Sequence, residues 1–217
     1  MDFAAEGEYW AIALSGTGGW IVAGGDRIAR IDANGTIAWQ EPAGGASPGS
    51  IPIIAPDPAG GFLIAGEAAE APGAITAARF DDRGPVWNTT IRGDPGEGYL
   101  PSAVRQDATG GYSLLAGVTD GEPAGVLEIS LGGDGSILQR STINASAPVT
   151  WTPGGGYLSA ALIENGYGGA LFRAERLDED GLVQWTSTQR LDEYSIIVAL
   201  ILTSDGGSAA LGMYMKY

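Results

Sequence analysis

The chain has 217 residues, which is enough to bury a sizeable hydrophobic core. Its 44% hydrophobic and 17% charged content is typical of a globular protein and excludes a disordered one. Its 26 acidic and 11 basic residues give a net charge of −15, a field that repels phosphate backbones and anionic lipid surfaces. We therefore expect no nucleic acid partner, and no apolar run approaches the roughly 18 residues that membrane insertion requires.

The chain contains no cysteine and no histidine. Disulfides, thiolate sites, Ser-His-Asp triads and zinc sites with His or Cys ligands are therefore excluded. Catalysis would have to rest on carboxylates, Tyr or Arg, and the composition leaves a paired-carboxylate glycosidase open. Most acidic residues lie in predicted turns, so we assign no catalytic and no cofactor-binding residue.

A Gly-Gly pair followed by a short apolar strand recurs along the chain. Successive pairs are 42 to 51 residues apart, at Gly18-Gly19, Gly60-Gly61, Gly110-Gly111, Gly155-Gly156 and Gly206-Gly207. The 36 glycines recur at such turn-like positions, which indicates many short strands joined by tight turns.

A second landmark is a hairpin turn further along each of the first four copies. Asn34-Gly35, Asp134-Gly135 and Asp180-Gly181 tolerate the positive φ that a type I′ turn requires. An apolar residue precedes each turn (Ile31, Phe80, Leu131 and Leu177), and a tryptophan follows it in three copies (Trp39, Trp87 and Trp185). We interpret these tryptophans as packing between repeats, and Trp20, in the aromatic position after Gly-Gly, as core.

Four strands per unit at this period are typical of propeller blades. We predict an all-β fold, a single β-propeller domain over 1–217 with about five four-stranded blades, the last of them incomplete; a β-sandwich is the alternative. The predicted blades cover about 9–50, 51–100, 101–147, 148–195 and, in part, 196–217. Met1 to Gly7 would add one strand to the last blade; otherwise that blade is thin, or the chain belongs to a longer array or pairs through an open blade.

The two landmarks together resemble the Gly-Gly and Asp-x-x-Gly-x-x-x-Trp repeats of secreted bacterial and archaeal β-propellers. They are more distantly similar to the tryptophan-docked blades of quinoprotein-like propellers. The resemblance covers nearly the whole chain, from about Tyr9 onward. It implies the propeller fold and says almost nothing about function, because the fold is a scaffold with many uses.

Three copies place an arginine two residues before the turn aspartate. Arg30 precedes Asp32, Arg79 precedes Asp81 and Arg176 precedes Asp178, whereas Ser130 and Gly132 replace both residues in the third copy. The joint loss of Arg and Asp indicates a structural pairing within or between blades. The alternative is that the arginines contact a ligand at the rim or between blades.

The turn Asp178-Glu179-Asp180-Gly181 has the oxygen density that calcium favours. It lacks the later bidentate Glu and the spaced ligands of a complete calcium loop. A solvated turn is therefore the favoured interpretation, with no metal site assigned and calcium binding as the alternative.

Three glycosylation acceptors, Asn34, Asn88 and Asn144, lie at or near predicted turns or strand ends. They favour an extracellular or cell-surface location. The residues from Met1 to Glu6 lack the basic start and apolar stretch of a signal peptide. We expect either a cytoplasmic protein or a segment of a longer secreted chain.

The main functional hypothesis is a non-enzymatic extracellular binding or surface-display module with a protein or glycan ligand. Variable loops on a repeated frame are where such scaffolds place recognition, and four lie on one predicted rim: Ala43 to Ser50, Glu67 to Gly73, Arg92 to Gly98 and Thr119 to Ala124. The first alternative is a lectin, because five-bladed propellers of similar period resemble known sugar-binding ones. A carboxylate-based glycoside hydrolase or lyase and a purely structural acidic repeat are the others.

Overall fold

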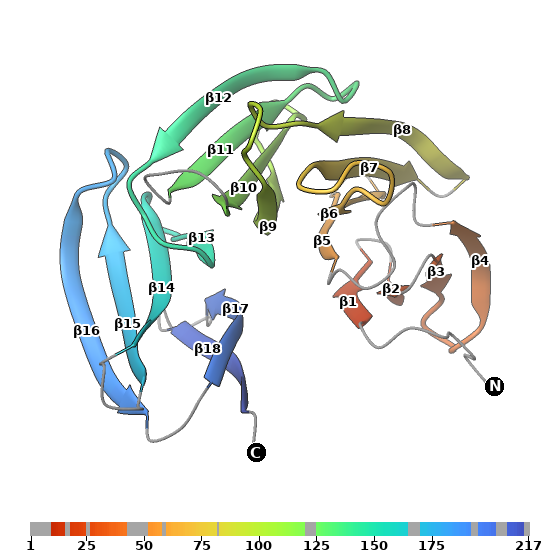
Figure 1. Ribbon diagram of the computed structural model, residues 1–217. Helices are drawn as coiled ribbons and strands as arrows, with labels where there is room; N and C mark the ends of the chain where they lie inside the picture. The colour runs from red at the N-terminus through yellow and green to blue at the C-terminus, as the bar shows by residue number, and fades with distance from the viewer. Residues whose placement is uncertain are drawn as a thin grey trace.

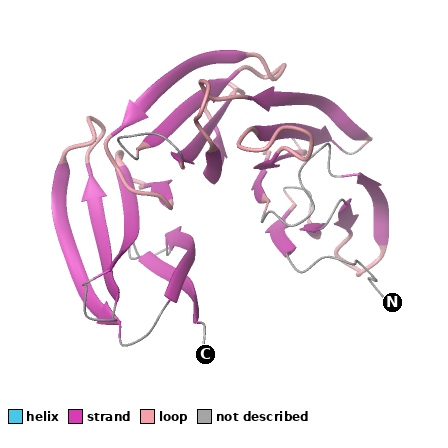
Figure 2. Cartoon of the chain, viewed as in Figure 1, coloured by secondary structure: helices cyan, strands magenta, loops and turns pink. Residues whose placement is uncertain are grey.

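A computed structural model gives the architecture of the chain. It describes residues 10–15, 18–24, 27–42, 52–57, 60–81, 83–119, 125–164, 170–191, 195–202 and 208–214. Within these ranges the chain consists of strands and turns, with no helix, and so contains no helix long and apolar enough to cross a membrane (Figure 2). The all-β prediction is confirmed.

The strands form four four-stranded antiparallel sheets and one two-stranded sheet, each in sequence order. The first sheet contains β1 (Trp10–Leu14), β2 (Trp20–Gly24), β3 (Arg27–Ile31) and β4 (Ile37–Pro42). The second contains β5 (Ile53–Pro56), β6 (Phe62–Glu67), β7 (Ile75–Asp81) and β8 (Gly84–Ile91). The third contains β9 (Tyr99–Gln106), β10 (Tyr112–Val118), β11 (Val126–Leu131) and β12 (Ile137–Ile143). The fourth contains β13 (Val149–Trp151), β14 (Tyr157–Glu164), β15 (Ala170–Leu177) and β16 (Val183–Leu191), and the fifth contains β17 (Ser195–Leu202) and β18 (Ser208–Tyr214).

The five sheets follow one another around an arc (Figure 1). The first strands of the sheets lie on the inside of the arc and contact one another in succession, while β4, β8, β12 and β16 lie on the outside. The arc is open between the first sheet and β17–β18, so the arrangement is propeller-like without a closed ring. The predicted strand from Met1 to Gly7 lies outside the described residues.

Each sheet presents one face to the preceding sheet and one to the following sheet, and we name these the leading and trailing faces. The leading face of the second sheet carries Phe62, Ile64, Ala78 and Phe80, which pack against Ile21, Ala23 and Ile28 of the first sheet. Its trailing face carries Leu63, Ala65, Ala77 and Arg79, and the apolar members pack against Leu114, Ala116, Ile129 and Leu131 of the third sheet. Both faces of the sheet are therefore buried, which explains why β6 reads as a continuous apolar run.

A close backbone contact explains why the two sequence landmarks recur in step. The second glycine of each described Gly-Gly pair lies against the carbonyl oxygen of the apolar residue before the next turn. A Cβ on Gly61 would lie 2.2 Å from the oxygen of Phe80, and a Cβ on Gly156 would lie 2.2 Å from that of Leu177. No side chain fits at that distance, so only glycine allows the second and third strands to come together there.

A β-bulge in the outer strand of each four-stranded sheet directs the tryptophans. In the first sheet Ile31 lies opposite Ile37 but Arg30 lies opposite Trp39, so Ala38 is the extra residue. The same shift occurs at Val86, Leu138 and Gln184 in the other three sheets. Because side chains alternate along a strand, the extra residue moves the following side chain onto the trailing face.

Trp39 shows how this side chain joins two sheets. Its ring stacks on Phe62 at 5.9 Å and on Phe80 at 6.1 Å, and these two rings stack on each other at 5.1 Å. The predicted packing of tryptophan between repeats is confirmed for this residue. Trp87 makes the corresponding contact, with its ring edge-on to Tyr112 of the third sheet at 5.9 Å.

Trp20 departs from the prediction that it is a core residue. It is 38% exposed, whereas Phe62, Tyr112 and Tyr157 at the same position are 2%, 1% and 8% exposed. In those sheets the preceding sheet covers the aromatic ring, whereas the arc is open in front of the first sheet (Figure 1).

Replacing the central ring of this stack is expected to destabilise the fold strongly. Phe62→Ala removes the group that separates Trp39 from the core, and we expect a loss of about 3–5 kcal/mol in the free energy of unfolding. Val86→Ala, at an exposed bulge position, is the control and changes it by less than about 0.5 kcal/mol. Urea unfolding followed by circular dichroism measures both; similar values for the two variants would contradict the interface.

Candidate functional site

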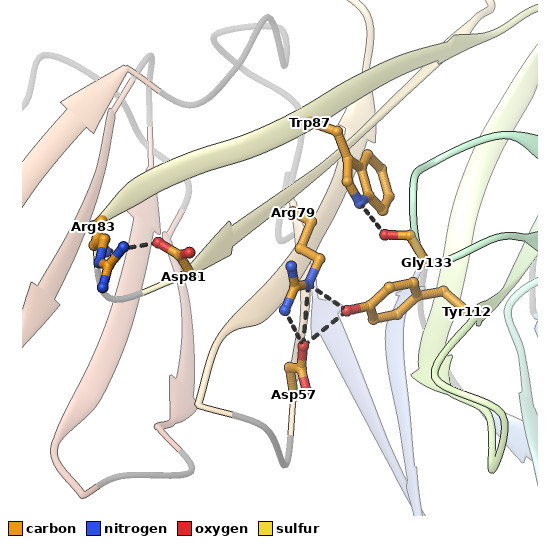
Figure 3. A network of polar contacts seen from close by, with 7 residues as sticks. All are labelled: Asp57, Arg79, Asp81, Arg83, Trp87, Tyr112 and Gly133. Atoms are coloured by element: carbon orange, nitrogen blue, oxygen red, sulfur yellow. Dashed lines mark hydrogen bonds and ion pairs between the residues drawn. The ribbon is translucent and has the colours of Figure 1, made fainter.

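The most extensive buried polar cluster described lies between the second and third sheets (Figure 3). Asp57 is fully buried, Tyr112 is 1% exposed, and the Arg79 side chain is 22% exposed. Arg79 donates to Asp57 Oδ2 from Nη2 at 2.9 Å and from Nε at 3.1 Å. The Tyr112 hydroxyl donates to the same oxygen at 2.9 Å and accepts from Arg79 Nε at 2.8 Å. The three side chains thus satisfy one another.

The local turn places Asp57 in this cluster. Asp57 follows the innermost strand β5, and its backbone N–H donates to Gly61 O at 2.8 Å across the Gly-Gly turn. Arg79 lies on the trailing face, opposite Leu63 on one side and Trp87 on the other. Tyr112 comes from the leading face of the next sheet, so the cluster joins two sheets.

Two further hydrogen bonds strengthen the same junction. Trp87 Nε1 donates to Gly133 O at 2.8 Å (Figure 3), and Thr89 Oγ1 donates to Gly135 O at 2.7 Å. Both acceptors lie in the Asp-x-x-Gly turn of the third sheet. The outer strand of one sheet therefore reads the turn backbone of the next, and this contact depends on the bulge that places Trp87 on the trailing face.

The junction between the third and fourth sheets uses a carboxylate in place of the arginine. Glu128 accepts a hydrogen bond from Trp151 Nε1 at 3.0 Å and another from the Tyr157 hydroxyl at 2.9 Å. Arg105 lies over the Trp151 ring at 4.3 Å. Sequence reasoning missed Glu128; the available signal was an acidic residue inside a strand, two residues before the Ser130 that replaces the expected arginine.

The predicted site arginines lie on the trailing faces of three separate sheets. Arg30, Arg79 and Arg176 are each opposite a tryptophan, namely Trp39, Trp87 and Trp185. Arg30 Nε is 3.9 Å from Asp32 Oδ1, a within-sheet contact of the kind expected. Arg79 instead pairs with Asp57, while Asp81 accepts from the Arg83 backbone N–H at 2.7 Å. In the third sheet Ser130 lies opposite Gln139, so the arginine and the tryptophan are lost together.

Most turn aspartates are engaged in local hydrogen bonds. Asp178 Oδ1 accepts from the backbone N–H groups of Asp180 and Leu182, and its Oδ2 accepts from Gln184 Nε2. Hydrogen bonds from the Thr109 and Ser136 side chains lower the pKa values of Asp107 and Asp134, respectively. In the described part of the chain no three Asp or Glu side chains are grouped closely enough to hold a metal ion. The five innermost strands contain no Asp or Glu.

The alternation of antiparallel strands places the variable loops at one end of the sheets and the Gly-Gly and Asp-x-x-Gly turns at the other. We call these the loop end and the turn end. At the loop end, residues 68–74 of the second sheet, the connection 92–98 and residue 119 are joined by backbone hydrogen bonds. Tyr99 N donates to Gly73 O and Thr119 N donates to Gly98 O, both at 2.8 Å. The predicted loops 43–50 and 120–124 lie outside the described residues.

Side chains brace the loop end at the junction of the second and third sheets. The Tyr99 hydroxyl donates to Glu97 Oε2 at 3.0 Å, and Arg140 Nη1 donates to Arg92 O at 2.9 Å. Burial and the Glu97 carboxylate raise the pKa of Tyr99. Above this frame the side chains of Glu70, Arg92 and Asp94 are exposed. The loop end thus presents charged groups of both signs on a hydrogen-bonded backbone.

The three predicted glycosylation acceptors are all exposed. Asn34 lies in the turn between β3 and β4, where its Oδ1 accepts from Thr36 N at 2.9 Å. Asn88 lies in the outer strand β8, and Asn144 directly follows β12.

Neither the protein-family models nor the curated proteins include a match to this chain. The resemblance to secreted propeller repeats therefore remains an expectation from the sequence motifs.

The buried tyrosines at the two junctions make stability depend on alkaline pH. Burial and the hydrogen-bonded carboxylates Asp57 and Glu128 raise the pKa values of Tyr112 and Tyr157 to about 12, from about 10 in an unfolded chain. Both are protonated in both states below pH 10, so their contribution is constant there. Stability is then lost as the pH rises from about 10 to about 12.

This pH dependence is measurable by urea unfolding at about pH 9 and about pH 11, together with the phenolate absorbance. We expect two of the eight tyrosines to ionise late, and Tyr112→Phe to remove one of them and to flatten the alkaline loss of stability. If all eight ionised near pH 10 in the folded protein, the two tyrosine–carboxylate contacts would be refuted.

Proposed function

We propose that this chain is a non-enzymatic binding or surface-display module that contacts a protein or glycan ligand through its loop end. The observation that carries the proposal is the difference between the two ends of the sheets. The turn end repeats the same tight backbone contacts in each sheet. The loop end differs from sheet to sheet and is held by hydrogen bonds between neighbouring sheets.

The buried junctions support a binding role for the loops. At the Asp57–Arg79–Tyr112 cluster the charged groups are paired and hydrogen-bonded, so this cluster serves to join sheets. A scaffold whose sheets are fixed relative to one another presents loops at low entropic cost, which favours affinity. The exposed charges Glu70, Arg92 and Asp94 supply polar contacts on that frame.

Two finer parts of the proposal concern the ring and its setting. We take β17–β18 as part of a fifth blade, because this sheet contacts the fourth as the fourth contacts the third. We place the protein outside the cell or on its surface, because Asn34, Asn88 and Asn144 are all accessible for glycosylation.

Exposed arginines at the two ends provide a matched test of the binding surface. The wild-type chain is screened on a glycan array and against a displayed peptide library. Arg92→Ala at the loop end and Arg83→Ala at the turn end are then compared on the retained ligand. We expect Arg92→Ala to weaken binding by about tenfold and Arg83→Ala to leave it unchanged.

The outcome of the screen also separates the ligand classes. Retention on the glycan array alone would select the lectin alternative. A greater effect of Arg83→Ala than of Arg92→Ala, or no retained ligand in either format, would contradict the loop-end proposal.

A further inference from the structure

The fifth sheet has a free edge beside an exposed tryptophan. Within the described residues β18 pairs with β17 alone, while the other sheets have four strands. β17 contacts β13 and β14, so the two-stranded sheet packs against the inner half of the fourth sheet (Figure 1). Trp185 lies in the outer strand β16 and is 44% exposed, whereas Trp39 and Trp87 are half-buried.

The covered tryptophans show what Trp185 lacks. Trp39 is covered by Phe62 from the second strand and by Phe80 from the third strand of the next sheet. Trp87 likewise packs against a core that includes Tyr112 from the second strand and Leu131 from the third. The sheet that follows Trp185 has a second strand, β18, but no described third strand. The missing element is therefore a strand with a bulky apolar residue at the position of Phe80 and Leu131.

The hydrogen-bonding groups around Trp185 repeat those of a finished junction. Trp87 and Thr89 donate to two carbonyls of the next Asp-x-x-Gly turn. Trp185 and Ser187 have the same spacing in β16 and the same types of donor, and both are exposed. A hairpin with an Asp-x-x-Gly turn fits these donors as well as the free edge.

We propose that the edge of β18 and the exposed face of β16 form a docking site for a β-hairpin of a separate chain. The first strand of this hairpin pairs antiparallel with β18 and places a bulky apolar side chain on Trp185. This mode is β-strand addition, in which main-chain hydrogen bonds give affinity and the side-chain contact gives specificity. A second copy of this chain does not supply the hairpin, because 27–42, 75–91, 126–143 and 170–191 each already form half of a sheet.

The test uses a synthetic peptide of residues 75–91, the hairpin that covers Trp39 in this chain, and the full-length protein. Fluorescence anisotropy measures binding to wild type and to Trp185→Ser. Trp20→Ser is the matched control, because Trp20 is a similarly exposed tryptophan, 38% against 44%, at the other side of the opening. We expect Trp185→Ser to weaken binding at least about tenfold and Trp20→Ser to leave it unchanged.

Two further readouts keep the result independent of folding defects. Hydrogen exchange of the backbone amides in 208–214 is expected to slow when the peptide binds, and a peptide with Phe80→Ser is expected to bind about tenfold more weakly. No binding by the wild type, or equal loss in both tryptophan variants while both still unfold cooperatively, would overturn the proposal. A dimer of the chain alone that Trp185→Ser dissociates would assign the surface to a second copy and would also overturn it. The site is separate from the loop end, so either proposal can fail alone.

Discussion

The contact on which the structure depends is an aromatic ring that follows a Gly-Gly turn and lies against the trailing face of the preceding sheet. Phe62 meets Trp39, Tyr112 meets Trp87 and Arg79, and Tyr157 meets Glu128. Each ring needs two local features to reach its partner. A glycine brings the second and third strands together, and a bulge turns the outer-strand side chain toward the next sheet. Sequence, turn geometry and sheet packing are thus parts of one repeated junction.

The chemistry of the junction changes while its geometry is kept. Between the first and second sheets it is aromatic stacking, between the second and third it is a buried ion pair with a tyrosine, and between the third and fourth it is a carboxylate with two ring donors. A buried Asp–Arg pair gains little net stability over apolar packing, because both charges lose water. Its effect is to fix the partner and the register, since an Asp57 without its donors would be strongly destabilising. The polar groups at these junctions therefore serve to order the sheets, which leaves the loops for recognition.

The sequence predicted the strands, the order of the sheets and the role of Trp39, because period-two apolar patterns and glycine turns are local signals. It did not predict that Arg79 pairs with Asp57, because 22 residues separate them and the pairing depends on how the turn of β5 meets β7. Glu128 was missed for the same reason, since its partners come from the next sheet. Trp20 has the same local sequence as the buried rings, and only the opening in the arc makes it half-exposed. Contacts between sheets, and where the series of sheets is interrupted, are properties of the tertiary structure.

The central claim is that neighbouring sheets are coupled through these side chains, and a double-mutant cycle between Asp57 and Tyr112 tests it most directly. Asp57→Asn, Tyr112→Phe and the double variant are unfolded in urea, and the coupling is the departure of their free energies from additivity. The account predicts a coupling of at least about 1 kcal/mol, because each residue lies in a different sheet and they share one hydrogen bond at 2.9 Å. Additive effects within about 0.3 kcal/mol would show that the two sheets are not joined at this point and would contradict the account.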